Sequence, residues 1–312
     1  MRAFIFPGQG SQAVGMGAAL AAASRTARDV FDEVDQALDQ NLFRLMRGGP
    51  EDELKLTENA QPAIMANSIA VFRALTRDGG IELTKAVNFV AGHSLGEYSA
   101  LCAAGSFDLA TTAKLLKLRG QAMQQAVPVG VGAMAALLGA DLALAQKIAD
   151  AAAQGDVCTV ANDNDPSQVV ISGHKAAIDR AIEMAKDMGA KRAVPLPVSA
   201  PFHCPLMQPA AEAMRDALGY VVVAQPAVPV FANVTAQPES DPDTIRNQLV
   251  EQVTGMVRWR ESVANMFDAG VHEFVEVGGK VLGSMVKRIA PDAQVTSVVS
   301  IEDVEALAKE IA

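Results

Sequence analysis

The segment Gly92-His93-Ser94-Leu95-Gly96 points most directly to chemistry. It fits the pattern G-x-S-x-G, with an apolar stretch before it and a helix-compatible stretch after it. In that setting the glycines allow a sharp turn that lifts the serine oxygen clear of a sheet. The helix N-terminus behind the serine offers free N–H groups to an oxyanion. The pattern therefore predicts Ser94 as a nucleophile, although strings of this length also occur by chance.

A serine nucleophile needs a general base, and the chain has four histidines. His93 adjoins Ser94 on the same turn, where neighbouring side chains point apart, and His174 and His272 lie in segments that resemble ordinary surface loops. His203 stands between two prolines in a stiff loop before a helix, which suits a general base with a pKa near neutrality. We predict His203 as the base. No carboxylate stands out as the third member of a triad, so that position stays open to a backbone carbonyl.

The helix expected over residues 109–125 carries an arginine on its apolar side. Arg119 shares this side with Leu116 and Met123. A buried arginine must meet an anion, because an unpaired charge there is very costly. That anion is either an internal carboxylate or a substrate carboxylate. The second reading follows from the short turn between this helix and the Ser94 helix, and a carboxylate could be held there by two hydrogen bonds.

The elements that must position these residues alternate between strand and helix. In the first part we expect strands over 2–6 and 86–91, and helices over 16–40, 61–75, 95–104 and 109–125. From about residue 127 the order is βαββαβ, with strands over 133–138, 157–162, 168–172 and 191–196, and helices over 143–153 and 176–188. The fold class is therefore α/β. A mainly parallel sheet with helices on both sides is expected in residues 1–126 and 198–312, and a ferredoxin-like subdomain in 127–197.

Composition narrows the classes of protein. The chain of 312 residues has a net charge of −10, which argues against nucleic-acid binding. It contains no apolar run of about eighteen residues and does not begin like a signal peptide, so we expect no membrane span. Its three cysteines are scattered, which argues against disulfides and a zinc site and suits the cytoplasm.

Several segments, in order along nearly the whole chain, resemble the marker segments of malonyl-CoA:acyl carrier protein transacylases. They are similar also to the acyltransferase domains of fatty acid and polyketide synthases. The stronger segments are Phe6-Pro7-Gly8-Gln9-Gly10-Ser11-Gln12, Gly92-His93-Ser94-Leu95-Gly96-Glu97-Tyr98, Leu118-Arg119-Gly120 and Ala200-Pro201-Phe202-His203, and the weaker ones are Ala60-Gln61-Pro62-Ala63 and Gln168-Val169-Val170-Ile171-Ser172-Gly173. The resemblance implies an α/β-hydrolase-like domain with a ferredoxin-like insert.

The resemblance also implies roles for matching residues. Ser94 matches the nucleophile of the family and His203 its base. Arg119 matches the arginine that binds the free carboxylate of the malonyl group. Gln9 and Leu95 match the residues whose backbone N–H groups form the oxyanion hole.

Three further assignments complete the expected site. By the same resemblance the backbone carbonyl of Gln252 orients His203, which agrees with the missing acid, and Gln61 belongs to the substrate-binding residues. Phe202 stands beside the predicted base. Its ring would limit the space for an α-substituent, which favours malonyl over methylmalonyl.

The reaction implied by the resemblance is a ping-pong transfer for fatty acid biosynthesis. The malonyl group passes from malonyl-CoA to Ser94, and then to the phosphopantetheine thiol of holo acyl carrier protein. The expected partners are therefore coenzyme A, as malonyl-CoA, and acyl carrier protein. No bound cofactor or metal is expected.

Three alternatives stay open at this stage. A serine thioesterase or esterase would use the same pair, Ser94 and His203, but pass the acyl group to water. The segment Gly8–Ala13 mimics the G-x-G-x-x-A of nucleotide-binding proteins, yet residues 28–40 look helical where that fingerprint needs a second strand. A non-catalytic scaffold with an unused site is the third alternative.

Overall fold

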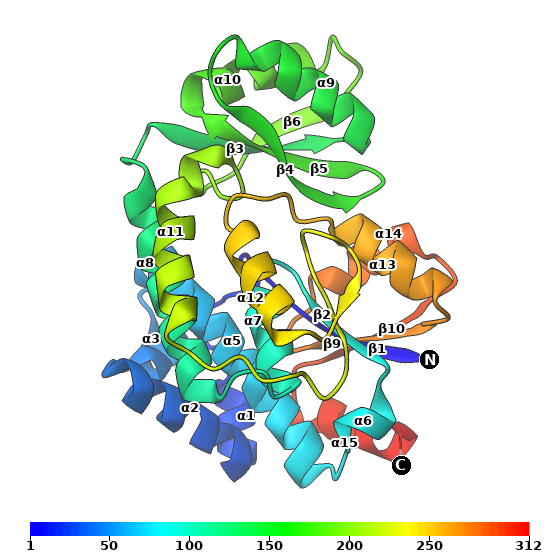
Figure 1. The fold of residues 1–312 in the computed structure, drawn as a ribbon. Coiled ribbons are helices and arrows are strands. Elements are labelled where there is room, and N and C mark those ends of the chain that lie inside the picture. Colours follow the sequence, from blue (N-terminus) through cyan, green and yellow to red (C-terminus); the bar gives the residue numbers. More distant parts are fainter. Residues whose placement is uncertain (312) are drawn as a thin grey trace.

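The computed structural model describes residues 1–311, which form two sheets with separate strand orders (Figure 1). Sheet A has the order β10-β9-β1-β2-β7-β8. Its neighbouring strands are parallel except for the antiparallel pair β7 and β8. The strands of sheet A are β1 Arg2–Phe6, β2 Phe89–Gly92, β7 Val230–Phe231, β8 Pro238–Glu239, β9 Glu273–Val277 and β10 Gln294–Val298.

The central strands of sheet A, β1, β2, β7 and β9, are buried on both faces, as their apolar residues require. Within β1, Ala3 and Ile5 join the hydrophobic cluster under α13 (Trp259–Asp268) and α14 (Leu282–Ile289). The alternate residues Phe4 and Phe6 face the opposite core. The other helices of this larger unit are α1 Ala18–Ala23, α2 Arg25–Leu38, α3 Leu42–Gly48, α4 Glu51–Lys55, α5 Thr57–Arg73, α6 Leu83–Ala86, α7 Leu95–Ala103, α8 Leu109–Ala126, α11 Gln208–Gly219, α12 Pro242–Glu251 and α15 Ile301–Ile311, with a π-helical turn at Ala74–Asp78 and a 3₁₀ turn at Pro205–Met207.

Two of the expected helices differ from the observed ones by more than three residues or in number. The expected helix over 16–40 is two helices, α1 and α2, because Ser24 has an extended backbone and caps α2 by accepting a hydrogen bond from the N–H of Ala27. The expected helix over 61–75 begins earlier, at Thr57. Pro62 therefore lies inside α5 and not in its first turn.

Sheet B forms the smaller unit, at the top of Figure 1. Its antiparallel strand order is β4-β5-β3-β6, and α9 (Leu142–Ala153) and α10 (Lys175–Ala185) contribute to its own hydrophobic core. The strands are β3 Gly132–Leu138, β4 Cys158–Asp165, β5 Gln168–His174 and β6 Arg192–Pro195. The expected α/β class with a βαββαβ insert is confirmed. We propose residues 127–197 as the bounds of this subdomain, and 1–126 with 198–312 as the catalytic domain.

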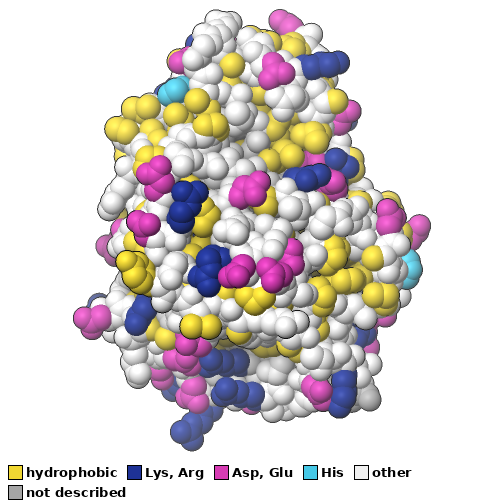
Figure 2. Space-filling model, viewed as in Figure 1, with side chains coloured by type: hydrophobic (Ala, Val, Ile, Leu, Met, Phe, Trp, Pro, Cys, Tyr) yellow, Lys and Arg dark blue, Asp and Glu magenta, His cyan; other side chains and the backbone are white. Residues whose placement is uncertain are grey.

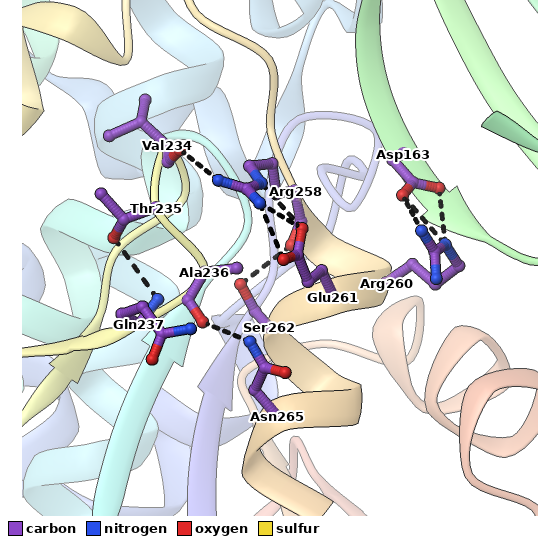
Figure 3. A network of polar contacts seen from close by, with 10 residues as sticks. All are labelled: Asp163, Val234, Thr235, Ala236, Gln237, Arg258, Arg260, Glu261, Ser262 and Asn265. Atoms are coloured by element: carbon purple, nitrogen blue, oxygen red, sulfur yellow. Dashed lines mark hydrogen bonds and ion pairs between the residues drawn. The ribbon is translucent and has the colours of Figure 1, made fainter. Parts of the chain in front are cut away.

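The end of β4 joins the two units. The Asp163 carboxylate receives two hydrogen bonds from Arg260 Nε, at 3.0 and 2.9 Å, and lies 2.8 Å from its Nη2 (Figure 3). Two residues further on, Asp165 Oδ2 accepts from Arg288 Nε at 2.8 Å. The main chain adds a hydrogen bond from the N–H of Val257 to the carbonyl of Ala161. Sheet B is thereby fixed against α13 and α14.

Candidate active site

Ser94 stands at the turn between β2 and α7 in an unusual backbone conformation. Its φ is 53° and its ψ is −112°, a sparsely populated combination for a residue with a side chain. A larger residue would not fit at either of the two flanking glycines, Gly92 and Gly96. A Cβ at Gly92 would lie 1.9 Å from the carbonyl carbon of Gly96, and a Cβ at Gly96 would lie 2.3 Å from the carbonyl oxygen of Phe6. The turn thus needs glycine on both sides of the serine.

Asn233 holds this strained turn from the neighbouring strand region. Its side-chain Oδ1 accepts a hydrogen bond from the Ser94 N–H at 2.8 Å, and its Nδ2 donates to the carbonyl of Gly92 at 2.7 Å. The segment with Asn233 follows β7, which is the parallel partner of β2. The carboxyl ends of adjacent parallel strands therefore bring the two residues together, as is usual for ligand sites in such sheets.

His203, the predicted base, lies within hydrogen-bonding distance of Ser94. Its Nε2 lies 2.8 Å from Ser94 Oγ, and its Nδ1 lies 2.9 Å from the backbone carbonyl of Gln252. A carbonyl only accepts hydrogen bonds, so Nδ1 carries the proton and Nε2 is free to accept from the serine hydroxyl. Burial, aided by the charge of Arg119, lowers the pKa of His203 to about 3. The imidazole is therefore neutral at physiological pH, as a base must be.

Arg119 projects from α8 into the same site. Its Nη1 donates to Gln61 Oε1 at 2.7 Å, and its Nη2 donates to Gln252 Oε1 at 2.9 Å and to Ser94 Oγ at 3.2 Å. Only 1% of Arg119 is exposed, and no carboxylate within residues 1–311 forms an ion pair with it. Its Nε has no partner in that part of the chain. The guanidinium charge is thus available to an anion bound beside the serine.

A cavity of about 410 Å³ opens onto these groups. Its size is within the usual range for a small-molecule site. Seven of the eight predicted site residues line it, and Gln252 is the exception because it is fully buried behind His203 and Arg119. The lining residues are Gln9, Gly10, Gln12, Lys55, Gln61, His93, Ser94, Leu95, Arg119, Met123, Met134, Asn162, Leu196, Pro197, Val198, Phe202 and His203.

The two predicted oxyanion donors come from two segments that meet at the serine turn. Leu95 is the first residue of α7, and Gln9 lies in the loop after β1, the strand that pairs with β2. The Gln9 side chain is fixed by a hydrogen bond from Thr57 Oγ1 at 3.1 Å. Within the described residues neither backbone N–H donates to a protein acceptor. Both are free to bind an oxyanion.

Sequence reasoning missed two residues of the site. Asn233 lies far from Ser94 in the chain and becomes relevant only through the pairing of β2 and β7. Glu97 is 3% exposed, and its Oε2 accepts from Gln252 Nε2 at 2.7 Å and from the Asn233 N–H at 3.2 Å. The sequence does contain a signal for Glu97, because Glu97 is the charged residue of the mostly apolar helix that follows Ser94. A charge among apolar residues is also the observation that identified Arg119.

His93, the neighbour of Ser94, has a different environment. Its Nε2 lies 2.8 Å from Asn164 Oδ1 of β4, and its ring is tilted against Trp259 at 5.8 Å between centroids. Burial lowers the pKa of His93. This histidine therefore links the serine turn to sheet B, while His203 alone is within reach of the hydroxyl.

Comparison with known proteins gives consistent matches. A family model described as acyl transferase domain matches residues 3–293. The chain is 47% identical to the malonyl CoA-acyl carrier protein transacylase of Escherichia coli K12 over 288 residues, 92% of each chain. It is 44% identical to the protein of that name from Bacillus subtilis over 289 residues, 92% of this chain and 90% of the other.

Solved structures match over almost the whole chain. The acyl-carrier-protein-S-malonyltransferase of Bartonella henselae superposes with a TM-score of 0.97 at 51% identity and covers 99% of both chains. A malonyl-transacylase solved in complex with a type II polyketide acyl-carrier protein superposes with a TM-score of 0.95 at 39% identity, again over 99% of both chains.

Proposed function

The chain belongs to the acyl transferase family, among its malonyl CoA-acyl carrier protein transacylases, and we propose on this premise that it transfers malonyl from malonyl-CoA to holo acyl carrier protein for fatty acid biosynthesis. The observation that carries the proposal is the position of Arg119. This buried guanidinium has no carboxylate partner in residues 1–311 and lies 3.2 Å from the nucleophile. A short acyl group with a free carboxylate fits such a site, because it brings the missing anion.

The first half-reaction loads the serine. His203 Nε2 removes the Ser94 proton while Oγ attacks the thioester carbonyl of malonyl-CoA. The N–H groups of Gln9 and Leu95 stabilise the oxyanion, and each donor of this kind contributes about 3 kcal/mol. As the carbon–sulfur bond breaks, the proton on His203 passes to the sulfur of coenzyme A, and malonyl-serine remains.

The second half-reaction reverses these roles. The phosphopantetheine thiol of the carrier protein gives its proton to His203, and its sulfur attacks the ester carbonyl. The oxyanion occupies the same two N–H groups. The carbon–oxygen bond then breaks, and His203 returns the proton to Ser94. No electron acceptor, metal or cofactor enters either half of this cycle, and the required groups all come from the chain and its two substrates.

Arg119 selects the acyl group in this scheme. Charge-assisted hydrogen bonds from a planar guanidinium hold a carboxylate in one orientation. Gln61 and Gln252 restrain Arg119, so little conformational freedom is lost when the carboxylate binds. Phe202 lines the cavity beside His203 and is 8% exposed. We assign to its ring the exclusion of an α-substituent, which favours malonyl over methylmalonyl.

The cytoplasm is the compartment we propose for this reaction. Within residues 1–311 no helix combines the length and the apolar character that a bilayer span needs. Cys102, Cys158 and Cys204 are all free thiols. Free thiols suit a reducing compartment.

Acidic and basic side chains are interspersed on the face of the molecule drawn in Figure 2. An acidic enzyme can still bind a charged carrier protein through such a mixed surface. Dissolved salt screens the repulsion between charges that are farther apart than one Debye length, roughly 8 Å at physiological ionic strength.

The deciding experiment is intact-mass spectrometry of the protein after brief mixing with malonyl-CoA, followed by a chase with holo acyl carrier protein. We expect a malonyl adduct on Ser94 that disappears as malonyl carrier protein forms, and no adduct in Ser94→Ala. Steady release of free malonate without a carrier-protein product would identify a thioesterase. An intact Ser94 with no turnover at all would identify a non-catalytic scaffold.

A further inference from the structure

Gln252 connects three parts of the site through one buried side chain and its backbone. Its carbonyl accepts from His203 Nδ1 at 2.9 Å, and its Oε1 accepts from Arg119 Nη2 at 2.9 Å. Its Nε2 donates to the carbonyl of Ser94 at 3.0 Å and to Glu97 Oε2 at 2.7 Å. Arg119 and the serine turn therefore depend on one side-chain amide and on which way it points, while His203 depends on the backbone carbonyl of the same residue.

Glu97 helps to fix that direction, together with the carbonyl of Ser94, which accepts from the same Nε2. Its Oε2 accepts hydrogen bonds from Gln252 Nε2 and from the Asn233 N–H, and an oxygen with these two contacts attracts the NH₂ end of an amide. The carbonyl end of Gln252 is then left facing Arg119. In the reversed orientation the NH₂ group would face the guanidinium donors, and Glu97 would face a carbonyl oxygen. Both contacts would be lost in a buried region, where unsatisfied polar groups are costly.

The Glu97 carboxyl also lies where its charge can act on the Arg119 guanidinium. Arg119 and Glu97 form no ion pair at 4.0 Å or less, yet Gln252 lies between them and hydrogen-bonds both. Burial raises the pKa of the Glu97 carboxyl to about 7, against the opposing effects of the hydrogen bonds from Gln252 and Asn233 and of the Arg119 charge. Above that pH the ionised carboxyl balances part of the arginine charge through an intervening neutral group. The guanidinium edge itself stays open to a substrate.

We propose that Glu97 is a positioning residue for acyl-group selection, which acts through the Gln252 side chain to direct the Arg119 guanidinium toward the substrate carboxylate. The inference rests on the proposed malonyl transfer. It assigns no contact between Glu97 and substrate. It predicts that Glu97 matters to substrates with a free carboxylate and matters far less to those without one.

The test compares malonyl-CoA with acetyl-CoA as acyl donors, with acylation of Ser94 followed by mass spectrometry. Glu97→Gln keeps the shape of the side chain but also allows the reversed amide pairing. We expect kcat/KM for malonyl-CoA to fall about 10-fold, which corresponds to one hydrogen bond to a charged group, while acetyl transfer changes less than about 3-fold. Equal losses for both donors would overturn the proposal and leave Glu97 a structural anchor for Asn233.

A double-mutant cycle separates positioning from a general structural effect. In an Arg119→Gln background the malonyl preference is already gone, so adding Glu97→Gln should not change the malonyl-to-acetyl ratio further. An independent additional loss of malonyl transfer in that background would contradict action through Arg119. If Glu97→Gln folds poorly, Gln252→Met gives the same comparison. It removes the amide but keeps the backbone carbonyl that holds His203, and the same malonyl-selective loss is expected.

Glu276 supplies a matched control. It is equally buried, and its carboxylate accepts from the N–H groups of Val281, Leu282 and Gly283 at the start of α14. Glu276→Gln should lower stability without changing the malonyl-to-acetyl ratio. The wild-type protein distinguishes the two levels of failure. Absence of a malonyl adduct in wild type refutes the proposed function, whereas a wild-type adduct with an unchanged ratio in Glu97→Gln refutes only the positioning role.

Discussion

At the scale of single residues, Arg119 places a positive charge in the buried interior of the site. Its charge is withdrawn from water, and within residues 1–311 its hydrogen bonds go to the neutral oxygens of Gln61, Gln252 and Ser94. The guanidinium carbon also lies 5.7 Å from the centre of the Tyr98 ring. A buried charge without a counter-ion lowers stability. This unfavourable feature of the folded state fits the role proposed for Arg119, in which the substrate brings the anion that the site lacks.

Replacing Arg119 tests that role. In Arg119→Gln we expect kcat/KM for malonyl-CoA to fall about 10- to 100-fold, since hydrogen bonds to a charged group contribute about 1.5–3 kcal/mol. Acetyl transfer should stay within about 3-fold, because an acetyl group offers no carboxylate. Arg180→Gln is the control, since Arg180 pairs with Asp156 on the small subdomain. Parallel losses on malonyl-CoA and acetyl-CoA in Arg119→Gln would contradict carboxylate binding.

The pH profile tests the state of His203. Burial and the charge of Arg119 bring its pKa to about 3 in the folded protein. The base is then neutral across the range where an ordinary histidine, with a pKa of about 6.5, would become protonated. We therefore expect kcat/KM for Ser94 acylation by acetyl-CoA, a donor without the carboxylate that Glu97 and Arg119 would select, to stay level as the pH falls from about 8 to about 5. A loss of activity centred near pH 6.5 would show that His203 titrates normally.

Arg119→Gln should shift that profile in a defined direction. Because the Arg119 charge is one cause of the lowered pKa of His203, its removal should raise the pKa. The acid limb of kcat/KM for acetyl-CoA should then move to higher pH than in wild type. An unchanged acid limb in the variant would indicate that burial alone sets the pKa.

The sequence identifies a site residue when the residue belongs to a recognisable pattern, is of a rare type, or lies where its type is not expected. Ser94 has its glycine pattern, His203 is one of four histidines, and Arg119 lies on an apolar helix face. Asn233 has none of these marks. Its role depends on a strand pairing and on a hydrogen bond between residues far apart in the chain, and such pairing has no local signal.

At the scale of elements, the close approach of β1, β2 and α7 sets the geometry of the serine turn. The Gly96 position lies against the carbonyls of Phe6 and Pro7, immediately before the loop that carries Gln9. The two expected oxyanion donors, Gln9 and Leu95, therefore belong to backbone segments in direct contact. A change in this packing would alter the distance between them.

Gly96→Ala tests this packing. Its Cβ would lie 2.3 Å from the Phe6 carbonyl oxygen and 2.8 Å from that of Pro7, so the backbone must move. We expect the free energy of unfolding to fall by about 1–3 kcal/mol. Acylation of Ser94 should slow about 100-fold, as a displacement near 1 Å in an active site can cause. Both quantities are accessible by urea unfolding and by acylation kinetics.

Gly48→Ala is the control for the glycine substitution. Gly48 ends α3 with no atom within 4 Å of its added Cβ, and alanine is favoured over glycine in a helix by about 0.5–1 kcal/mol. This variant should be as active as wild type and at least as stable. Full activity in Gly96→Ala would show that the turn tolerates a wider separation of its donors.

Element order could be predicted from the sequence more fully than element ends. The βαββαβ pattern of sheet B follows from apolar periodicity and turn residues, and it is confirmed. The division between α1 and α2 was missed because Ser24 ends one helix and caps the next within an Ala-rich stretch. The start of α5 was misplaced because Pro62 favours a first turn on its own, whereas tertiary packing extends the helix back to Thr57.

At the scale of the whole molecule, the active site lies where the two units meet. Asn162, on β4 of sheet B, lines the cavity, and Asn164 on the same strand contacts His93 beside the nucleophile. The same strand carries Asp163 and Asp165, which pair with arginines of α13 and α14. The sequence predicts both sheets, but the ion pairs between them join positions about a hundred residues apart and depend on the packed fold.

The pair of Asp165 and Arg288 allows this junction to be tested. Asp165 is fully buried, and without Arg288 its carboxylate would keep only the hydrogen bonds from the N–H and Oγ of Ser167. We expect Arg288→Ala to lower the free energy of unfolding by about 1–3 kcal/mol, because removal of one partner leaves a buried charge uncompensated. Urea unfolding followed by the fluorescence of Trp259, the single tryptophan, measures the change.

Two further variants make that result specific. Lys175→Ala removes an exposed pair with Asp179 on the outer surface of the small subdomain and should cost less than about 0.5 kcal/mol. Adding Asp165→Asn to Arg288→Ala removes the uncompensated charge and should restore part of the lost stability. If Arg288→Ala matched Lys175→Ala, or if the double variant were less stable than Arg288→Ala alone, the ion pair would not hold sheet B in place. The main-chain hydrogen bonds between β4 and the segment at Val257 would then hold the two units together. These bonds would also position Asn162 and Asn164 in the site.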